Sequence, residues 1–245
     1  MPEPIRVTVW GENIHEHRDQ QVKEIYPDTM HETIAAGLRA DLGDAVEVRT
    51  AWLQQPENGL TEEVLAGTDV LTWWGHAAHG DVSDEVVDRV QRAVQSGMGL
   101  LALHSAHFSK VFIRLMGTTC SLDWRSDQDR ELIWTVAAGH PIAAGIPHPL
   151  VLDAEEMYGE LFDIPQPDEL VFVSSFTGGE VFRSGCCYRR GRGRVFYFRP
   201  GDQDFPTYHN PHIRRVLANA VGWLAPSEPR ALPEVHHRPQ PDWFA

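Results

Sequence analysis

The chain has 245 residues, of which 42% are hydrophobic and 23% are charged, so it is long enough and apolar enough to bury a full core. The 21 basic and 35 acidic residues give a formal net charge of −14, without a block of Lys or Arg. This acidity argues against nucleic acids and anionic membranes as partners. Three cysteines without a CxxC spacing argue against a disulfide framework or a zinc ribbon.

The first half of the chain alternates apolar runs with amphipathic segments. Strands are expected at 5–11, 45–53, 69–75 and 99–103. Helices are expected at 30–42, at 61–66, from Ser83 to Gly97, and through Phe112 to Gly117. This alternation of strand and helix predicts right-handed crossovers and a mostly parallel sheet with helices on both of its faces.

From about residue 118 the pattern changes to strands that are separated by Pro and Gly turns. The predicted strands are ELIWTVA, LVLDAEEMYGE, LVFVSSF, GEVFRSGCCY and RVFYFRPG, and RRGRG between the last two predicts a β-hairpin. A closing helix is expected in HNPHIRRVLANAVGWLA, with Asn210 as its cap. The Pro-rich residues 226–245 predict an extended tail, so we expect one α/β domain over 1–225 and a tail over 226–245.

Two of the buried strands end in a His-x-x-His pattern. GLLALHSAHFSK (99–110) delivers His104 and His107, and DVLTWWGHAAH delivers His76 and His79. The carboxyl ends of parallel strands border the crevice where α/β sheets bind ligands. Imidazoles that meet there suit a divalent metal, zinc above others, and we expect His76, His104 and His107 as its ligands. The alternative is that some of these rings only form hydrogen bonds at the starts of helices.

Further chemistry is expected from the turn after 99–103 and from DAEEMYGE. His104 stands at the turn where α/β enzymes carry a nucleophile. Because LHSAH is not a G-x-S-x-G motif, the sequence gives only weak support for Ser105 as a nucleophile. No Cys occupies this turn, which argues against an amidotransferase mechanism. In a strand, Glu156 and Tyr158 would share one face. Glu156 would serve as base, and either Glu156 or Asp202 would supply a carboxylate ligand. The alternative for this acidic run is a solvated turn.

Polar and aromatic residues beside the other strand ends predict a rim that binds substrate. Trp74 is one of four tryptophans near these ends, whose rings would either stack on sugars or pack in the core. The expected substrate-binding residues are His15, Glu16, Trp74, His79, Asp202 and His209.

Taken together, WGENIHE, DVLTWWGHAAH, GMGLLALHSAHFSK, LMGTTC, GHPIAAGI, EEMYGE, GGEVFRSG and RVFYFRPG resemble the ThuA-like family, which is named for trehalose utilisation. The resemblance implies a flavodoxin-like fold of the class I glutamine amidotransferase type that lacks the catalytic Cys. It also implies a role in the metabolism of trehalose and related disaccharides, on 3-keto-sugars made by a partner oxidoreductase. The family pattern Pro-Gly-His-Glu is replaced here by Pro200, Gly201, Asp202 and Gln203.

The leading hypothesis is a metal-assisted enzyme, an isomerase, lyase or hydrolase, that acts on a keto-sugar or a related sugar derivative. His104, Glu156, Tyr158 and Ser105 are its predicted catalytic residues, and no nucleotide cofactor is expected. The alternative is a non-catalytic sugar-binding or regulatory protein that retains an amidotransferase-like pocket. The first residues, MPEPIRVTVW, lack a signal pattern, so we expect a cytoplasmic protein, and the tail suggests a homo-oligomer.

Overall fold

A computed structural model describes residues 3–227, and the predicted tail, apart from its first two residues, lies outside this range. The described chain forms one nine-stranded sheet with the order β2-β1-β3-β4-β9-β8-β7-β5-β6. The parallel part consists of β2 (Val46–Trp52), β1 (Ile5–Gly11), β3 (Val70–Trp74), β4 (Gly99–Leu103) and β9 (Gly193–Phe198). The antiparallel part consists of β8 (Val181–Arg190), β7 (Glu169–Ser175), β5 (Asp123–Thr135) and β6 (Leu150–Gly159). The α/β class is therefore confirmed, with the first four predicted strands in the parallel part.

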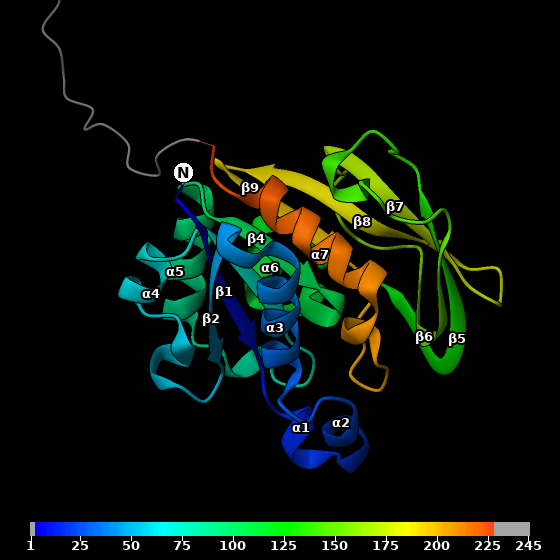
Figure 1. The fold of residues 1–245 in the computed structure, drawn as a ribbon, viewed down its shortest axis with the longest axis horizontal. Helices are drawn as coiled ribbons and strands as arrows, with labels where there is room; N and C mark the ends of the chain where they lie inside the picture. Colours follow the sequence, from blue (N-terminus) through cyan, green and yellow to red (C-terminus); the bar gives the residue numbers. More distant parts are fainter. Residues whose placement is uncertain (1–2, 228–245) are drawn as a thin grey trace, which may run out of the picture.

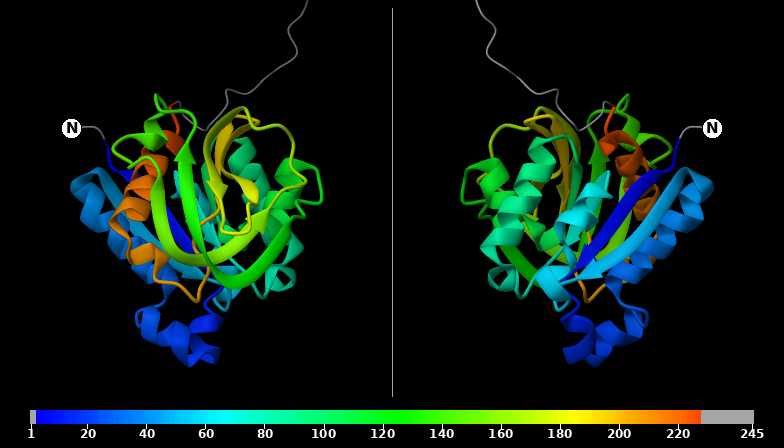
Figure 2. Two further views of the ribbon diagram at one scale, coloured as in Figure 1. Left: turned by 90° about the vertical axis from the view of Figure 1, so that its right-hand side faces the viewer. Right: turned by 90° about the vertical axis from the view of Figure 1, so that its left-hand side faces the viewer.

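Helices cover both faces of the parallel strands (Figures 1 and 2). One face carries α3 (Met30–Leu42) and α7 (Pro211–Leu224), and the other carries α4 (Glu62–Ala66), α5 (Asp84–Gln95) and α6 (Lys110–Met116). The side chains of β4 divide between the two cores: Leu101 and Leu103 pack with the first layer, whereas Leu100 and Ala102 pack with the second. A strand that is buried on both faces reads as a continuous apolar run, which explains its sequence.

Local capping explains where the helices start. The side chains of Ser83 and Thr61 accept hydrogen bonds from Val86 N and Val64 N at the starts of α5 and α4. Asn210 caps α7 as predicted. Short 3-10 helices form at Gly43–Ala45, Pro56–Gly59, His79–Asp81, His104–Phe108, Pro141–Ala143 and Thr207–His209.

The segment after β1 differs from the expected loop, because it contains α1 (His15–Arg18) and α2 (Gln20–Ile25). At four and six residues, these helices are too short to show an apolar period. Asp19 joins them and caps α2 by accepting a hydrogen bond from Gln21 N. Figure 1 shows both helices at the end of the sheet to which β1 points, so they border the carboxyl ends of the parallel strands.

The β5 strand begins at Asp123, earlier than the predicted ELIWTVA segment. Its first half, DWRSDQDR, is highly charged and lacks the apolar alternation by which strands are recognised. Pairing with β6 holds it in place, with Trp124 opposite Tyr158 and register shifts farther along. The β8 and β9 strands form the predicted hairpin, and Gly191 adopts a φ of +60° in its turn. Among the described residues, no helix is both long and apolar enough to cross a membrane.

Candidate active site

Three side chains from separate elements meet at the carboxyl ends of the parallel strands. His104 directly follows β4, Asp202 lies beyond β9, and Glu156 lies on β6. Nε2 of His104 is 3.2 Å from Oε2 of Glu156 and 3.3 Å from Oδ2 of Asp202. All three side chains are buried, and one ligand atom from each lies within 4.8 Å of the others. We call these three residues the His104 cluster.

The backbone and the hydrogen bonds of His104 fix the direction of its ring. Its φ of +51° is a left-handed conformation that few residues other than Gly adopt, and such strain is often found at functional sites. Nδ1 lies 3.1 Å from the carbonyl oxygen of Arg199. Because a carbonyl can only accept, Nδ1 carries a hydrogen, and Nε2 is the atom that faces the two carboxylates. This is the arrangement that orients histidines which bind metals.

The charges of the cluster control the protonation of His104. Burial by itself would lower the pKa of His104, but hydrogen bonds and charge from Asp202 and Glu156 outweigh burial and raise this pKa to about 10. The same contacts with His104 lower the pKa of Asp202 despite its burial. Without a cation, the imidazole is therefore protonated; a metal ion would take the place of that proton at Nε2.

Tyr158 completes the wall next to His104. Its hydroxyl oxygen lies 3.3 Å from Nε2 of His104, and the two rings stack with their centroids 5.0 Å apart. Burial, reinforced by the charge of Glu156, raises the pKa of Tyr158 well above its ordinary value, so the phenol stays neutral. As predicted for a strand, Glu156 and Tyr158 lie on the same side of β6, and both approach His104.

A buried charge network lies directly behind the cluster. The Arg199 guanidinium is fully buried, 3.0 Å from Oε2 of Glu155 and 3.4 Å from Oε2 of Glu131. It also donates to the carbonyl oxygen of Glu156. Burial raises the pKa of Glu131 to about 7, against the lowering effect of Arg199. This network was not predicted, because charged residues within otherwise apolar strands are the one sign of it in the sequence.

His76 and His15 form the next layer around the cluster. The ring centroids of His76 and His104 are 6.0 Å apart, and those of His15 and His76 are 5.1 Å apart in a stacked arrangement. Nδ1 of His76 and Nε2 of His15 are buried and have no hydrogen-bond partner within residues 3–227. Trp74 is buried beside both rings and donates from Nε1 to the carbonyl oxygen of Gly201 at 2.9 Å. Trp74 thus packs beside the two histidines, and its hydrogen bond to Gly201 holds the turn before Asp202.

Two acids after β1 hold the surrounding loops. Glu12, which was not predicted as a site residue, is fully buried and accepts hydrogen bonds from Ala77 N and Ala78 N. It also lies 3.8 Å from Nδ1 of His79. Burial lowers the pKa of His79 to about 4, with smaller effects from neighbouring histidines. Glu16 accepts a hydrogen bond from Met30 N at the start of α3. Glu12 and Glu16 therefore position loops and helices around the site.

Of the residues expected to bind a metal, the structure brings His104 together with Glu156 and Asp202, the two carboxylates considered for this role. His76 and His107 are not part of this group. His107 points away from the cluster, since its Nδ1 lies 2.7 Å from the carbonyl oxygen of Cys120 and its ring packs against aromatic side chains. Its backbone position at the strand end was evident in the sequence, but the direction of its side chain was not.

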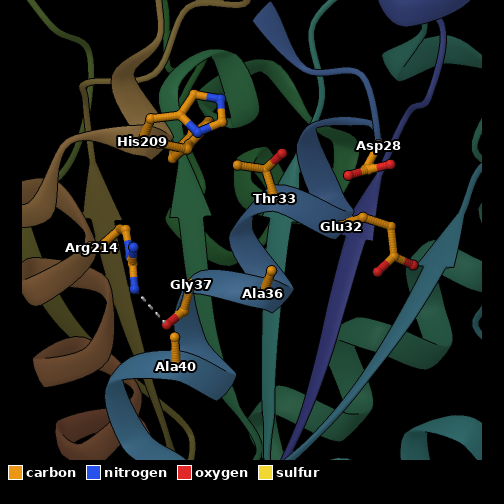
Figure 3. A pocket seen from close by; sticks show the side chains of 9 residues that line it. Asp28, Glu32, Thr33, Ala36, Gly37, Ala40, His209 and Arg214 are labelled. Carbon is orange, nitrogen blue, oxygen red and sulfur yellow. Dashed lines mark hydrogen bonds between the residues drawn. The ribbon is translucent and has the colours of Figure 1, made fainter.

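A cavity of about 80 Å³ opens onto the cluster. It is lined by His76, Ser105, His107, Phe108, Leu122, Trp124, Glu156 and Tyr158. His209, expected at the substrate rim, lies elsewhere: it stacks on Tyr26 and lines a cleft of about 700 Å³ beside α3. Figure 3 shows that cleft, with Arg214 reaching from α7 to the carbonyl oxygen of Gly37. The structure therefore separates His209 from the other predicted site residues.

None of the three cysteines lies at the cluster. Cys120, Cys186 and Cys187 are buried and free, and burial raises the pKa of all three thiols, to about 11 for Cys120 and about 12 for Cys186. A thiol nucleophile needs a lowered pKa and access to solvent. The imidazole of His104 stands at the turn after β4, where a nucleophile would be mounted.

The fold and site define an α/β protein with a flavodoxin-like parallel region, in which a buried histidine and two carboxylates lie at the carboxyl ends of the parallel strands. A family model described as ThuA, trehalose utilisation, matches residues 6–224. The chain therefore belongs to the ThuA family.

Solved structures agree with this assignment at the level of the fold. A ThuA-like protein from Bacteroides uniformis superimposes with a TM-score of 0.63 at 15% identity, over 91% of each chain. One from Parabacteroides merdae gives 0.63 at 14% identity, over 92% of each chain. The cold-adapted β-galactosidase from Rahnella sp. R3 gives 0.54 at 15% identity, over 91% of this chain and 32% of the enzyme. A comparison with curated proteins gave no match.

Proposed function

We propose that this ThuA family member is a metal-assisted enzyme, an isomerase, lyase or hydrolase, that acts on a keto-sugar or a related sugar derivative. The His104 cluster is the observation that carries the proposal, because one imidazole nitrogen and two carboxylates converge at a buried strand end. The family description, trehalose utilisation, supports a sugar as substrate. The β-galactosidase that shares the fold also acts on sugars, but at 15% identity it indicates no more than a shared fold.

The residues present fit a divalent cation. His104 offers Nε2, and its Nδ1 is already held by a carbonyl oxygen, while Glu156 and Asp202 offer carboxylate oxygens. Nitrogen and oxygen donors of this kind suit zinc, and a manganese ion would accept them as well.

The charge balance favours a cation at the same place. Glu131 and Glu155 are buried next to Arg199, and Glu156 and Asp202 are buried beside His104. Without a cation, the positive charges that face these four carboxyl groups are the Arg199 guanidinium and the protonated imidazole of His104. Buried charges are costly unless they are paired or coordinate a metal. A divalent cation would offset the excess negative charge.

In this proposal, the protein's own groups bind and move protons around the sugar. A cation bound by His104, Glu156 and Asp202 would supply Lewis acidity toward a sugar carbonyl. Tyr158 stays a neutral phenol and donates a hydrogen bond to the sugar from beside the cluster. His76 is half-buried and lines the cavity, so its imidazole is placed to accept a proton from the carbon next to the carbonyl.

The proposal is tested by elemental analysis of the purified protein together with mass spectrometry of 3-keto-trehalose incubated with it. We expect one divalent ion per chain and product formation that His104→Ala abolishes. Absence of metal, combined with unchanged turnover in His104→Ala, would refute the proposal. A non-catalytic sugar-binding protein, the alternative suggested by the missing nucleophile, would bind the sugar without converting it. The oxidoreductase that would supply the keto-sugar, the homo-oligomer and the cytoplasmic location also stay predictions.

A further inference from the structure

We infer that the cavity beside the His104 cluster binds an uncharged sugar ring stacked on Trp124 and discriminates against sugars that carry phosphate or carboxylate groups. The inference rests on the proposed function, because it names the class of sugar that the same site takes. It assigns to Trp124 a role in substrate specificity rather than in the reaction itself.

Trp124 combines exposure with a fixed place at the mouth of the cavity. Its side chain is 63% exposed, although it is one of the largest apolar groups of the chain. It lies directly opposite Tyr158 in the pairing of β5 with β6. Because paired residues of antiparallel strands point to the same face, the indole lies next to the phenol that stacks on His104. Trp124 therefore continues the wall of the site outward toward solvent.

The rest of the lining divides into an apolar rim and a polar floor. Phe108, which is 40% exposed, and Leu122 line the same cavity as Trp124. Glu156 and His76 line the inner side. A pyranose has apolar C–H faces that pack on aromatic rings, and hydroxyl groups that bind carboxylates and imidazoles. An aromatic platform outside and hydrogen-bonding groups inside match both parts of such a ring.

The charges around the cavity exclude an anionic sugar. The described lining contains no Lys or Arg, and its acidic member, Glu156, lies close to the Asp202 carboxylate. The nearest guanidinium along β5 belongs to Arg125, which is engaged by Asp127, Asp129 and Glu180. Behind the cluster, Arg199 is engaged by Glu131 and Glu155. A cation at the cluster would be neutralised by the Glu156 and Asp202 carboxylates, and the lining offers no Lys or Arg. A phosphate or carboxylate on the sugar would therefore find no unpaired positive charge to bind it.

The test measures binding separately from turnover. Ligand-observed NMR titrations of the full-length protein with trehalose and with trehalose 6-phosphate report the affinity for each sugar. Saturation transfer reports which ring protons touch the protein. The informative variants are Trp124→Ala and Trp124→Phe. The matched control is Trp134→Phe, because Trp134 lies on the same strand and is 36% exposed, but contacts Ser175 and His148 instead of the cavity.

We expect saturation transfer to the C–H protons of trehalose in the wild-type protein and in Trp134→Phe. Trp124→Ala should weaken trehalose binding about tenfold, whereas Trp124→Phe retains most of the affinity. Trehalose 6-phosphate should bind at least about tenfold more weakly than trehalose at 0.15 M salt. Thermal unfolding of each variant confirms that an exposed position was changed without loss of the fold.

Three outcomes would overturn the inference: no binding of trehalose to the wild-type protein, unchanged binding in Trp124→Ala, or equal affinity for the phosphorylated sugar. These failures are distinguishable from failure of the proposed function. Sugar binding through Trp124 in a protein that holds no metal and converts no keto-sugar would refute the proposed function alone. Turnover of a keto-sugar that does not depend on Trp124 would refute this inference alone.

Discussion

The imidazole Nδ1 of His104 lies 3.1 Å from the backbone carbonyl oxygen of Arg199, the residue whose side chain neutralises the buried acids behind the site. Arg199 therefore orients the imidazole of His104 with its backbone carbonyl and balances the charge behind the site with its side chain. The left-handed conformation of His104 brings the ring into line with that carbonyl. The cluster is thus organised before any ligand binds, which is what an efficient catalytic site requires.

Glu156→Gln should weaken the binding of Zn²⁺ or Mn²⁺ at least about tenfold, because the amide keeps the shape of the side chain but loses the charge that pairs with the cation. Equilibrium dialysis followed by elemental analysis measures this affinity. His209→Ala is the matched control, since its side chain lies in the separate cleft beside α3. Equal metal affinity in Glu156→Gln and the wild-type protein would contradict the assignment of Glu156 as a ligand.

Arg199→Met should destabilise the protein by about 3–5 kcal/mol, because it leaves Glu131 and Glu155 buried without a counter-charge. Urea unfolding measures the free energy of unfolding. Arg214→Met removes a partly exposed ion pair with Asp41 and should cost about 1 kcal/mol or less. If both variants lost the same small amount, the network around Arg199 would not be the stabilising element that its burial indicates.

Much of the fold could be predicted from local patterns. The helix expected at 30–42 is α3, and the strand expected at 99–103 is β4, since continuous apolar runs and capping residues mark such elements. The charged first half of β5 was missed, because it is defined by pairing with β6 and not by its own composition. Long-range pairing of this kind leaves little signal in a single sequence.

The candidate site was predictable in position but not in detail. Strand ends indicated His104 and His76, and strand alternation indicated that Glu156 and Tyr158 share a face. The direction of each side chain depends on tertiary contacts, so the sequence did not reveal that His107 turns toward Cys120. Asp202, expected as a possible carboxylate ligand and as a residue of the substrate rim, turns toward His104 and lies inside the cluster.

Gly201→Ala should both destabilise the protein and weaken metal binding. Gly201 has a φ of +129°, and a Cβ at this position would collide with the Tyr208 side chain. Relief of that collision would move the turn that carries Asp202 and so disturb the cluster. Gly222→Ala is the control, because it lies in α7 where a Cβ meets no atom within 4 Å, and it should stabilise the helix by about 1 kcal/mol. Thermal unfolding and metal dialysis of both variants give the comparison, and unchanged metal affinity in Gly201→Ala would argue against this role of the turn.

His107 should make the stability of the protein sensitive to acid. Burial lowers the pKa of His107 to about 3, although its hydrogen bond to the Cys120 carbonyl works in the opposite direction. A histidine exposed to solvent has an ordinary pKa of 6.5. Between these two values the unfolded chain binds a proton that the folded chain does not bind. The free energy of unfolding therefore falls as the pH falls from 6.5 toward 3.

His107→Phe removes this titration while preserving a ring among the aromatic neighbours. At pH 7.5 the variant should be less stable than the wild-type protein by about 1 kcal/mol, since it loses the hydrogen bond to Cys120. At pH 4.5 the wild-type protein should have lost about 2–3 kcal/mol relative to the variant, which would reverse their order. Urea unfolding at the two pH values measures both differences in the free energy of unfolding. The other buried histidines contribute equally to both proteins, so their effects cancel in the comparison. A difference between the proteins that stays the same at both pH values would show that His107 does not stay neutral in the folded state.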